Sequence, residues 1–200
     1  MTPDELSSCE AIRRALYLYA RAVDRCDREL LRDLYHPDAT DVHGNAFRGN
    51  GREFADWLID WSVRLLVSSH VVTNVVIDLH GERAFVESRY AALQRFPLAG
   101  GAAVDRRSAG RYLDVFAQRD GEWRILHRRT VIETRSAEPR TAAELAEVVD
   151  PRRPAPLAAL APGHAPDDPV YRSFAIGEIA IEPYVARDPV EATMEHYAAG

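Results

Sequence analysis

A tyrosine, an aspartate and a histidine have side chains that together could carry out acid–base chemistry. Tyr19 and Asp24 are five residues apart in the stretch "LYARAVDRCD", and His70 begins the run "HVVTNVVIDL". Histidine is a common general base, and a carboxylate that bonds one ring nitrogen fixes the tautomer and raises the basicity of the imidazole. A tyrosine hydroxyl can bond an oxygen on which negative charge develops. These residue types could therefore remove a proton and stabilise the resulting anion.

Each of these residues also has an ordinary structural explanation. Tyr19 lies on an apolar helical stripe, whereas Asp24 lies roughly 90° from the centre of that stripe, as a helix-end carboxylate in water would. His70 lies in a strand whose two faces are both fairly apolar, which predicts a central strand buried on both sides. A buried histidine must be hydrogen-bonded, and most such histidines are not catalysts. The residue pattern leaves both interpretations open.

Three helices are predicted in the first third of the chain. Ser7 and Glu10 form a capping box for a helix over about 8–25, and Asp27 suits the N-cap of a short second helix. Residues 52–66 show the spacing of a third amphipathic helix. Its buried side is expected to carry Phe54, Trp57, Leu58, Trp61 and Leu65. Between the last two helices, "ATDVHGNAFRG" predicts a hairpin that turns at Gly44-Asn45, with His43 ending its first strand.

Four strand-like runs follow, over residues 69–79, 83–96, 108–118 and 123–134, and two of their junctions are tight turns. Helices followed by a meander of long strands predict an α+β fold. We expect a cone-shaped α+β barrel, in which a curved antiparallel sheet and three helices on one side enclose a pocket.

Alternation along these strands groups several polar side chains. His70 and Asn74 share one face of the first strand, and Tyr112 shares a face of the third with Asp114. On the last strand Arg128 and Thr130 lie on one face and His127 on the other. One face of that strand must be the concave one.

The composition is that of a globular protein, with 46% hydrophobic and 28% charged residues. The net charge of −6 argues against a nucleic-acid partner. The N-terminus lacks the apolar core of a signal peptide, and no long apolar run predicts a membrane span. Cys9 and Cys26 lie about 25 Å apart on one predicted helix, so we expect free thiols and a cytoplasmic location.

The sequence lacks the motifs of several common classes of enzyme and cofactor-binding site. There is no dinucleotide or phosphate-binding glycine motif, no GxSxG, no HExxH and no CxxC pair. His43 and His70 with a carboxylate could in principle hold a metal, but their spacing does not support it. We expect neither a metal nor a cofactor.

The amino-acid composition of the chain changes near the start of its C-terminal third. We assign residues 1–137 to one domain and 138–200 to an extension. The extension is expected to contain a short helix capped by Thr141 and Glu144, a proline- and alanine-rich linker, and an apolar tail. The tail could cover the pocket or cross to another subunit.

Three stretches resemble the SnoaL-like family, which has the cone fold of nuclear transport factor 2. They are "YARAVDRCDRELLRDLYHPDA", "SSHVVTN" and "GRYLDVFAQRDGEWRILHRR", and the resemblance covers about residues 8–135. The group includes scytalone dehydratase, a bile-acid 7α-dehydratase and hexachlorocyclohexane dehydrochlorinase. The resemblance implies an enzyme that needs no cofactor and forms a homo-oligomer, a dimer or a trimer.

The resemblance also implies roles for individual residues. Asp24 and His70 match the base dyad of the eliminating members, and Tyr19 matches a tyrosine that the bile-acid dehydratase uses. His43 and Tyr112 stand near pocket positions of scytalone dehydratase. The last-strand comparison favours the Arg128 and Thr130 face as the pocket side. We add Phe54, Trp57 and Asn74 to the predicted pocket.

The predicted function is a cofactor-free lyase that performs dehydratase-type elimination. His70, oriented by Asp24, would take a proton next to a carbonyl, while Tyr19 would bind the carbonyl oxygen or the departing hydroxyl. The substrate is expected to be small and hydrophobic, such as a polyketide, steroid or terpenoid.

Two alternatives remain beside this prediction. An isomerase or polyketide-type cyclase would use the same dyad, because those reactions also begin with proton abstraction. A non-catalytic ligand-binding or adaptor module could hold the same three residues as a structural network. Geometry separates this last class from the enzymes, because an enzyme requires Asp24 and His70 in direct contact beside an open cavity.

Overall fold

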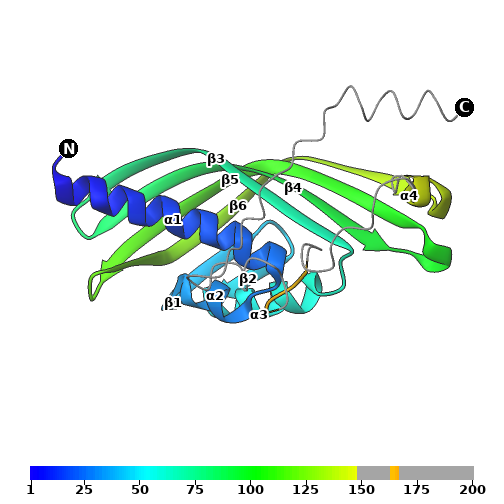
Figure 1. The fold of residues 1–200 in the computed structure, drawn as a ribbon. Coiled ribbons are helices and arrows are strands. Elements are labelled where there is room, and N and C mark those ends of the chain that lie inside the picture. Colours follow the sequence, from blue (N-terminus) through cyan, green and yellow to red (C-terminus); the bar gives the residue numbers. More distant parts are fainter. Residues whose placement is uncertain (148–162, 167–200) are drawn as a thin grey trace, which may run out of the picture.

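The computed structural model describes residues 1–147 and 163–166. Their elements are, in chain order, α1 (Pro3–Arg25), α2 (Arg28–Asp33), β1 (Tyr35–His43), β2 (Phe47–Asn50), α3 (Gly51–Ser62), β3 (Val67–His80), β4 (Arg83–Pro97), the 3-10 turn η1 (Ala99–Gly101), β5 (Ala103–Arg119), β6 (Glu122–Arg140) and α4 (Ala142–Glu147). Figure 1 shows one curved sheet with α1 lying across its strands and α2 and α3 beside β1 and β2. The predicted α+β class is confirmed.

The sheet is mixed rather than wholly antiparallel. Its order is β2-β1-β6-β5-β4-β3, and every pairing is antiparallel except that of β1 with β6, which is parallel. The predicted hairpin at Gly44-Asn45 is confirmed as the connection between β1 and β2. Residue alternation gives the faces of a strand but not its direction, so the parallel pairing had no signal in the sequence.

The prediction that the His70 strand is central was wrong, because β3 is an edge strand. Its inner face packs against α1, while Val71 and Val76 on the other face are more than half exposed. Apolar residues on both faces therefore do not indicate burial on both faces in this strand.

Two of the register shifts in this sheet are β-bulges that change the side on which some residues lie. Between Thr73 and Val76 the register of β3 shifts, and Asn74 takes a left-handed conformation with φ of 50°. On β6, Ala109 pairs with Thr134 but Gly110 pairs with Ile132, so one extra residue, Glu133, lies between them. At this second bulge the strands approach so closely that a Cβ on Gly110 would lie 2.0 Å from the Val131 carbonyl oxygen. The extra residue reverses the alternation of β6 beyond Glu133, and Arg135 consequently lies on the inner face.

The helices differ from prediction mainly at their ends. Asp27 caps α2 as expected, by accepting a hydrogen bond from the Leu30 amide at 3.1 Å. The third helix ends at Ser62, four residues before its predicted end. The first begins five residues early, because Thr2 and Glu5, rather than Ser7 and Glu10, form the capping box.

The capping box at Thr2 should contribute measurably to stability. Thr2→Ala removes the oxygen that accepts from the Glu5 amide at 3.2 Å, so we expect a loss of about 1 kcal/mol in the free energy of unfolding. Ser7→Ala is the matched control, because Ser7 lies within α1 and alanine favours helix. Urea unfolding followed by circular dichroism measures both. Equal effects of the two changes would contradict this assignment.

The predicted free thiols and the predicted C-terminal helix are confirmed. Cys9 and Cys26 are unpaired. Thr141 and Glu144 exchange the expected capping bonds at the start of α4. The expected linker and docking tail lie outside the described residues. Across residues 1–147 and 163–166, no helix has both the length and the apolar character needed to cross a membrane.

Candidate active site

Asp24 and His70 form a direct contact between the last turn of α1 and the edge strand β3. His70 Nδ1 lies 2.6 Å from Asp24 Oδ1. The backbone amide of His70 donates to Asp24 Oδ2 at 2.8 Å, and the Ser68 hydroxyl donates to Asp24 Oδ1 at 3.0 Å. Three donors from one strand therefore hold the carboxylate, and both of its oxygens are used.

This arrangement orients the imidazole. A carboxylate acts only as an acceptor, so the bond to Asp24 places the proton of a neutral ring on Nδ1. The lone pair is then on Nε2, the ring nitrogen that remains available to the cavity that His70 lines. A neutral imidazole held in this tautomer can accept a proton from a bound molecule.

A cavity of about 200 Å³ lies beside this contact. Four of the predicted site residues line it: Tyr19, His43, Trp57 and His70. The other lining residues are Val23, Ala46, Leu58, Trp61, Tyr90, Ala92, Gln94, Arg106, Ser108, Ile132 and Arg135. The cavity is enclosed by α1, α3 and the inner faces of β4, β5 and β6.

The remaining predicted site residues lie elsewhere. Phe54 is buried behind the wall of the cavity, where its ring stacks on His43 with centroids 4.9 Å apart. Tyr112, Arg128 and Thr130 are also buried and do not line the cavity. Asn74 stands apart, because the bulge in β3 leaves it exposed.

A buried ion pair supports Tyr19 from behind. Arg128 donates from Nε and Nη2 to the two oxygens of Asp114 at 2.8 and 2.7 Å. Its guanidinium lies between the rings of Tyr19 and Tyr112, 4.0 and 4.2 Å from their centroids. Burial raises the pKa of Tyr19 far above its usual value, against the opposing influence of Arg128. The hydroxyl therefore stays protonated and is able to donate a hydrogen bond.

His43 is held as a neutral ring. Its Nδ1 lies 3.1 Å from the Thr130 hydroxyl. Burial lowers the pKa of His43 to about 4, and the positive charges of Arg128, Arg135 and Arg106 act in the same direction. Near neutral pH it can offer a hydrogen bond to a ligand without adding charge.

Asp41 is a second buried carboxylate, behind the cavity. It accepts from the Tyr35 hydroxyl at 2.8 Å. Its other oxygen, Oδ1, lies 4.0 Å from His43 Nδ1 and has no hydrogen-bond partner among the described residues. Burial raises the pKa of Asp41 to about 7, although Arg128 opposes the shift.

This shift predicts how Asp41→Asn depends on pH. In the unfolded chain Asp41 loses its proton near pH 4, whereas in the folded protein it keeps it up to about pH 7. The folded state therefore loses stability from this group as pH rises through that window. Asparagine does not titrate, so from pH 4 to 8 the variant should gain roughly 2–4 kcal/mol relative to the parent.

Urea unfolding of both proteins at several pH values measures this difference. His43 titrates in the opposite direction, since its lowered pKa makes stability rise between about pH 4 and 6.5, but it is present in both proteins and cancels to first order. A difference that does not change with pH would show that folding does not raise the pKa of Asp41.

Sequence reasoning missed five polar lining residues. Ser108 lay within the predicted strand 108–118 and shares the face of Tyr112, but it was not singled out. Arg106 shares that face too, but it lies before the start of the predicted strand. Tyr90 and Gln94 share the inner face of β4. Arg135 reaches the inner side only because of the bulge at Glu133, for which the sequence gives no signal.

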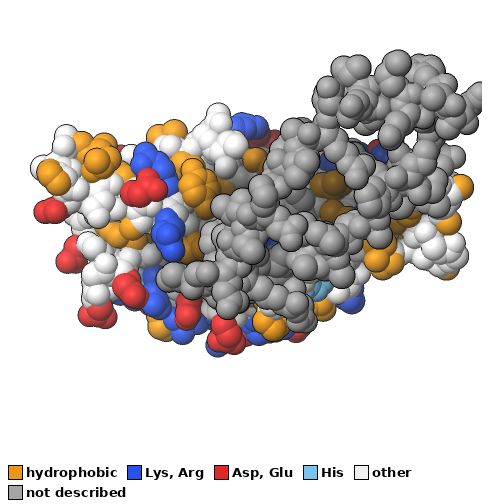
Figure 2. All heavy atoms as spheres, viewed as in Figure 1, with side chains coloured by type: hydrophobic (Ala, Val, Ile, Leu, Met, Phe, Trp, Pro, Cys, Tyr) orange, Lys and Arg blue, Asp and Glu red, His pale blue; other side chains and the backbone are white. Residues whose placement is uncertain are grey.

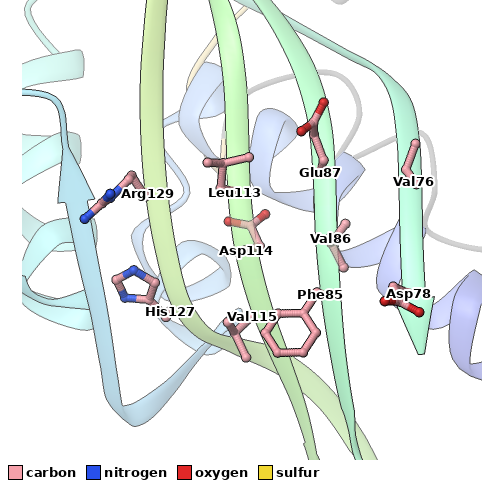
Figure 3. A pocket seen from close by; sticks show the side chains of 10 residues that line it. All are labelled: Val76, Asp78, Phe85, Val86, Glu87, Leu113, Asp114, Val115, His127 and Arg129. Atoms are coloured by element: carbon pink, nitrogen blue, oxygen red, sulfur yellow. The ribbon is translucent and has the colours of Figure 1, made fainter. Parts of the chain in front are cut away.

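A second hollow, of about 450 Å³, lies on the opposite face of the sheet. Figure 3 shows its side chains on β6, β5, β4 and β3, with helices behind the strands. Its histidine, His127, lies 2.7 Å from the Thr40 hydroxyl and contacts no carboxylate of residues 1–147 or 163–166. Val76 and Phe85 on its wall are more than half exposed. This larger hollow therefore lacks the oriented base of the inner cavity.

The comparisons with known proteins agree with this architecture. The SnoaL-like domain family matches residues 4–129, more than half of the chain. The protein belongs to the SnoaL-like family. No curated protein matches this SnoaL-like chain.

Solved structures share the fold of this SnoaL-like protein. A proposed scytalone dehydratase from Novosphingobium aromaticivorans DSM 12444 is 25% identical with a TM-score of 0.61, and the match covers 68% of this chain and 91% of the other. A type 2 hexachlorocyclohexane dehydrochlorinase (LinA) has 19% identity, a TM-score of 0.61 and the same coverages. The LinA-type3 enzyme from Novosphingobium barchaimii LL02 has 21% identity and a TM-score of 0.57, over 68% of this chain and 92% of the other.

Proposed function

We propose that this SnoaL-like protein is a cofactor-free lyase that begins its reaction by removing a proton from carbon. The observation that carries the proposal is the 2.6 Å contact between His70 Nδ1 and Asp24 Oδ1 beside a cavity of about 200 Å³. Both geometric requirements for an enzyme, direct contact and an open cavity, are met. The solved structures that share this fold include a dehydrochlorinase and a proposed dehydratase, and this likeness supports an elimination.

The proposed reaction is the loss of water from a β-hydroxy carbonyl compound. His70 Nε2 takes the proton between the two functional groups, and the electron pair of that C–H bond moves toward the carbonyl oxygen. The protonated Tyr19 hydroxyl, or neutral His43, donates a hydrogen bond to that oxygen. The C–O bond then breaks, and the imidazolium returns its proton to the departing hydroxide, which leaves as water.

The walls of the cavity suit a small and largely apolar molecule. Trp57, Trp61 and Leu58 of α3 face the inner strands across it. Excluding water in this way strengthens the electrostatic interactions between the polar groups and the substrate.

Proton exchange tests the proposal before the natural substrate is known. Scytalone, hexachlorocyclohexane and a panel of cyclic β-hydroxy ketones are incubated with the protein in D₂O and followed by proton NMR. We expect at least one compound to lose water or hydrogen chloride, or to exchange its acidic C–H for deuterium, and His70→Ala to do neither. Exchange or elimination that persists in His70→Ala would overturn the proposal.

The same experiment separates the alternatives. Elimination gives an unsaturated product, isomerisation gives a product of unchanged mass with a moved double bond, and cyclisation joins two carbons of one molecule. A protein that binds panel members, as seen by saturation transfer, but exchanges none of them would be a binding module.

A further inference from the structure

The polar part of the cavity wall is positively charged, although the protein carries a net charge of −6. Arg106 and Arg135 line the cavity together with His43 and His70, and no lining residue is an aspartate or glutamate. Asp24 bonds His70 but does not itself line the cavity. The cavity therefore has the opposite sign to the protein as a whole.

Arg106 is fixed in place by groups that do not neutralise it. Its Nε and Nη2 both donate to Gln94 Oε1, at 3.2 and 2.6 Å. Its guanidinium stacks over the rings of Trp61 and Phe96, 5.0 and 4.7 Å from their centroids. The side chain is thus oriented by a neutral amide and two aromatic rings, while its charge stays uncompensated by any carboxylate of the described part of the chain.

Arg135 adds a second such charge at the mouth of the cavity. The bulge at Glu133 turns it to the inner side, and it has no carboxylate partner within residues 1–147 and 163–166. Its charge lowers the pKa of both Arg106 and His43, secondary to their burial. Two like charges held near each other favour an anion between them.

Other arginines of the same sheet show the contrast. Arg95 and Arg140 both pair with Asp105, and Arg89 and Arg111 both pair with Glu133. Arg128 pairs with Asp114, as described above. These arginines pair with carboxylates of the chain itself, whereas the two arginines that line the cavity do not, so a ligand in the cavity can supply the carboxylate.

We propose that the substrate is a small organic acid whose carboxylate binds Arg106 and Arg135 while its apolar body reaches His70 and Tyr19. This inference rests on the proposed function, since it concerns the same cavity. Guanidinium groups match carboxylates in geometry and can bond them with two parallel hydrogen bonds. A volume of about 200 Å³ is below the range of about 300–1,000 Å³ for drug-sized ligands, which favours a small acid.

Two probes of equal shape test the inference with the full chain. 2-Naphthoate carries a carboxylate, and 2-naphthamide is its neutral counterpart; both are titrated by isothermal calorimetry. We expect naphthoate to bind at least about tenfold more tightly, because charge-assisted hydrogen bonds are stronger than neutral ones. Arg106→Gln and Arg135→Gln should each remove most of that preference and change the affinity for naphthamide by less than about twofold.

Arg129→Gln is the matched control. Arg129 is an exposed arginine on the outer face of β6, so its loss changes the net charge equally but leaves the cavity intact. Arg135 is also exposed, so Arg135→Gln should fold even if Arg106→Gln does not. Equal affinity for the two probes, no saturable binding of naphthoate, or an unchanged preference in Arg135→Gln would overturn the inference.

His70→Ala separates this inference from the proposed function. Naphthoate binding requires no chemistry, so His70→Ala should keep the preference for the acid while losing proton exchange. If the preference is absent but exchange depends on His70, only the inference about charge fails. If the preference is present but exchange persists in His70→Ala, only the proposed reaction fails.

Discussion

His70→Ala should lower turnover by about 10²–10⁴-fold, the contribution that a positioned general base usually makes. Alanine removes the ring nitrogen that faces the cavity and leaves no other imidazole bonded to Asp24. The side chain is mostly buried at the edge of the sheet, but the backbone bond from residue 70 to Asp24 Oδ2 remains possible. The circular dichroism spectrum should therefore be unchanged.

A second histidine on β3 provides the control. His80 Nε2 lies 2.9 Å from Asp78 Oδ2, so it forms a histidine–aspartate contact of similar length on the same strand. Both side chains are mostly exposed, and neither lines the cavity. His80→Ala should keep full turnover. Equal losses in the two variants would point to a general effect on β3 and not to a catalytic base.

Asp24→Asn should be nearly as damaging, and for a different reason. One atom of the asparagine side chain must be an NH₂ group. If the amide oxygen keeps the bond from the backbone of His70, the NH₂ group faces Nδ1 and donates to it. The ring proton then moves to Nε2, which can no longer accept one. We expect kcat to fall by at least about a hundredfold with little change in KM, because binding needs no base.

Asp114→Asn should have the largest effect on stability. Arg128 is completely buried, and Asp114 is its ion-pair partner. Removing the carboxylate leaves a buried guanidinium uncompensated, which typically costs about 3–5 kcal/mol. We expect that decrease in the free energy of unfolding, measured by urea unfolding at pH 7.

Two comparisons show whether the cost arises from the buried charge. Arg119→Gln breaks an arginine–aspartate pair with Asp38 that is exposed to solvent. It should leave the urea concentration at the midpoint of unfolding almost unchanged. Arg128→Met combined with Asp114→Leu removes both charges and should recover much of the loss. A double variant as unstable as Asp114→Asn would mean that the Tyr19 and Tyr112 rings depend on the guanidinium itself.

The sequence allowed the central contact to be predicted, but only by combining weak signals. Helical spacing predicted α1 and the position of Tyr19, and strand alternation grouped His70 with Asn74 without showing which face is the inner one. The pairing of His70 with Asp24 was predicted from the resemblance to the SnoaL-like family. Neither signal showed that Asp24 faces β3. The position of a residue on a helical wheel describes an isolated helix and does not include the elements that pack against it. The contact with His70 arises from the packing of α1 on the sheet, which is tertiary structure.

The errors on Asn74 and Arg135 have a common physical origin in strand irregularities. Strict alternation placed Asn74 with His70, but the bulge in β3 inserts a residue and leaves Asn74 exposed. The same kind of insertion at Glu133 brought Arg135 to the inner face. Alternation also does not show how deeply a side chain is buried. Arg128 and Thr130 were therefore predicted to line the pocket, whereas they lie behind the cavity wall.

The position of β3 at the edge of the sheet bears on when the protein can become active. Asp24 and His70 are 46 positions apart in the chain, and they meet only where the end of α1 rests on this outermost strand. A nascent or partly folded chain in which α1 has not docked therefore contains an imidazole without its aligning carboxylate. Under the proposed function, competence for proton abstraction appears only when α1 and the edge strand β3 are both in place, which ties the chemistry to completion of folding.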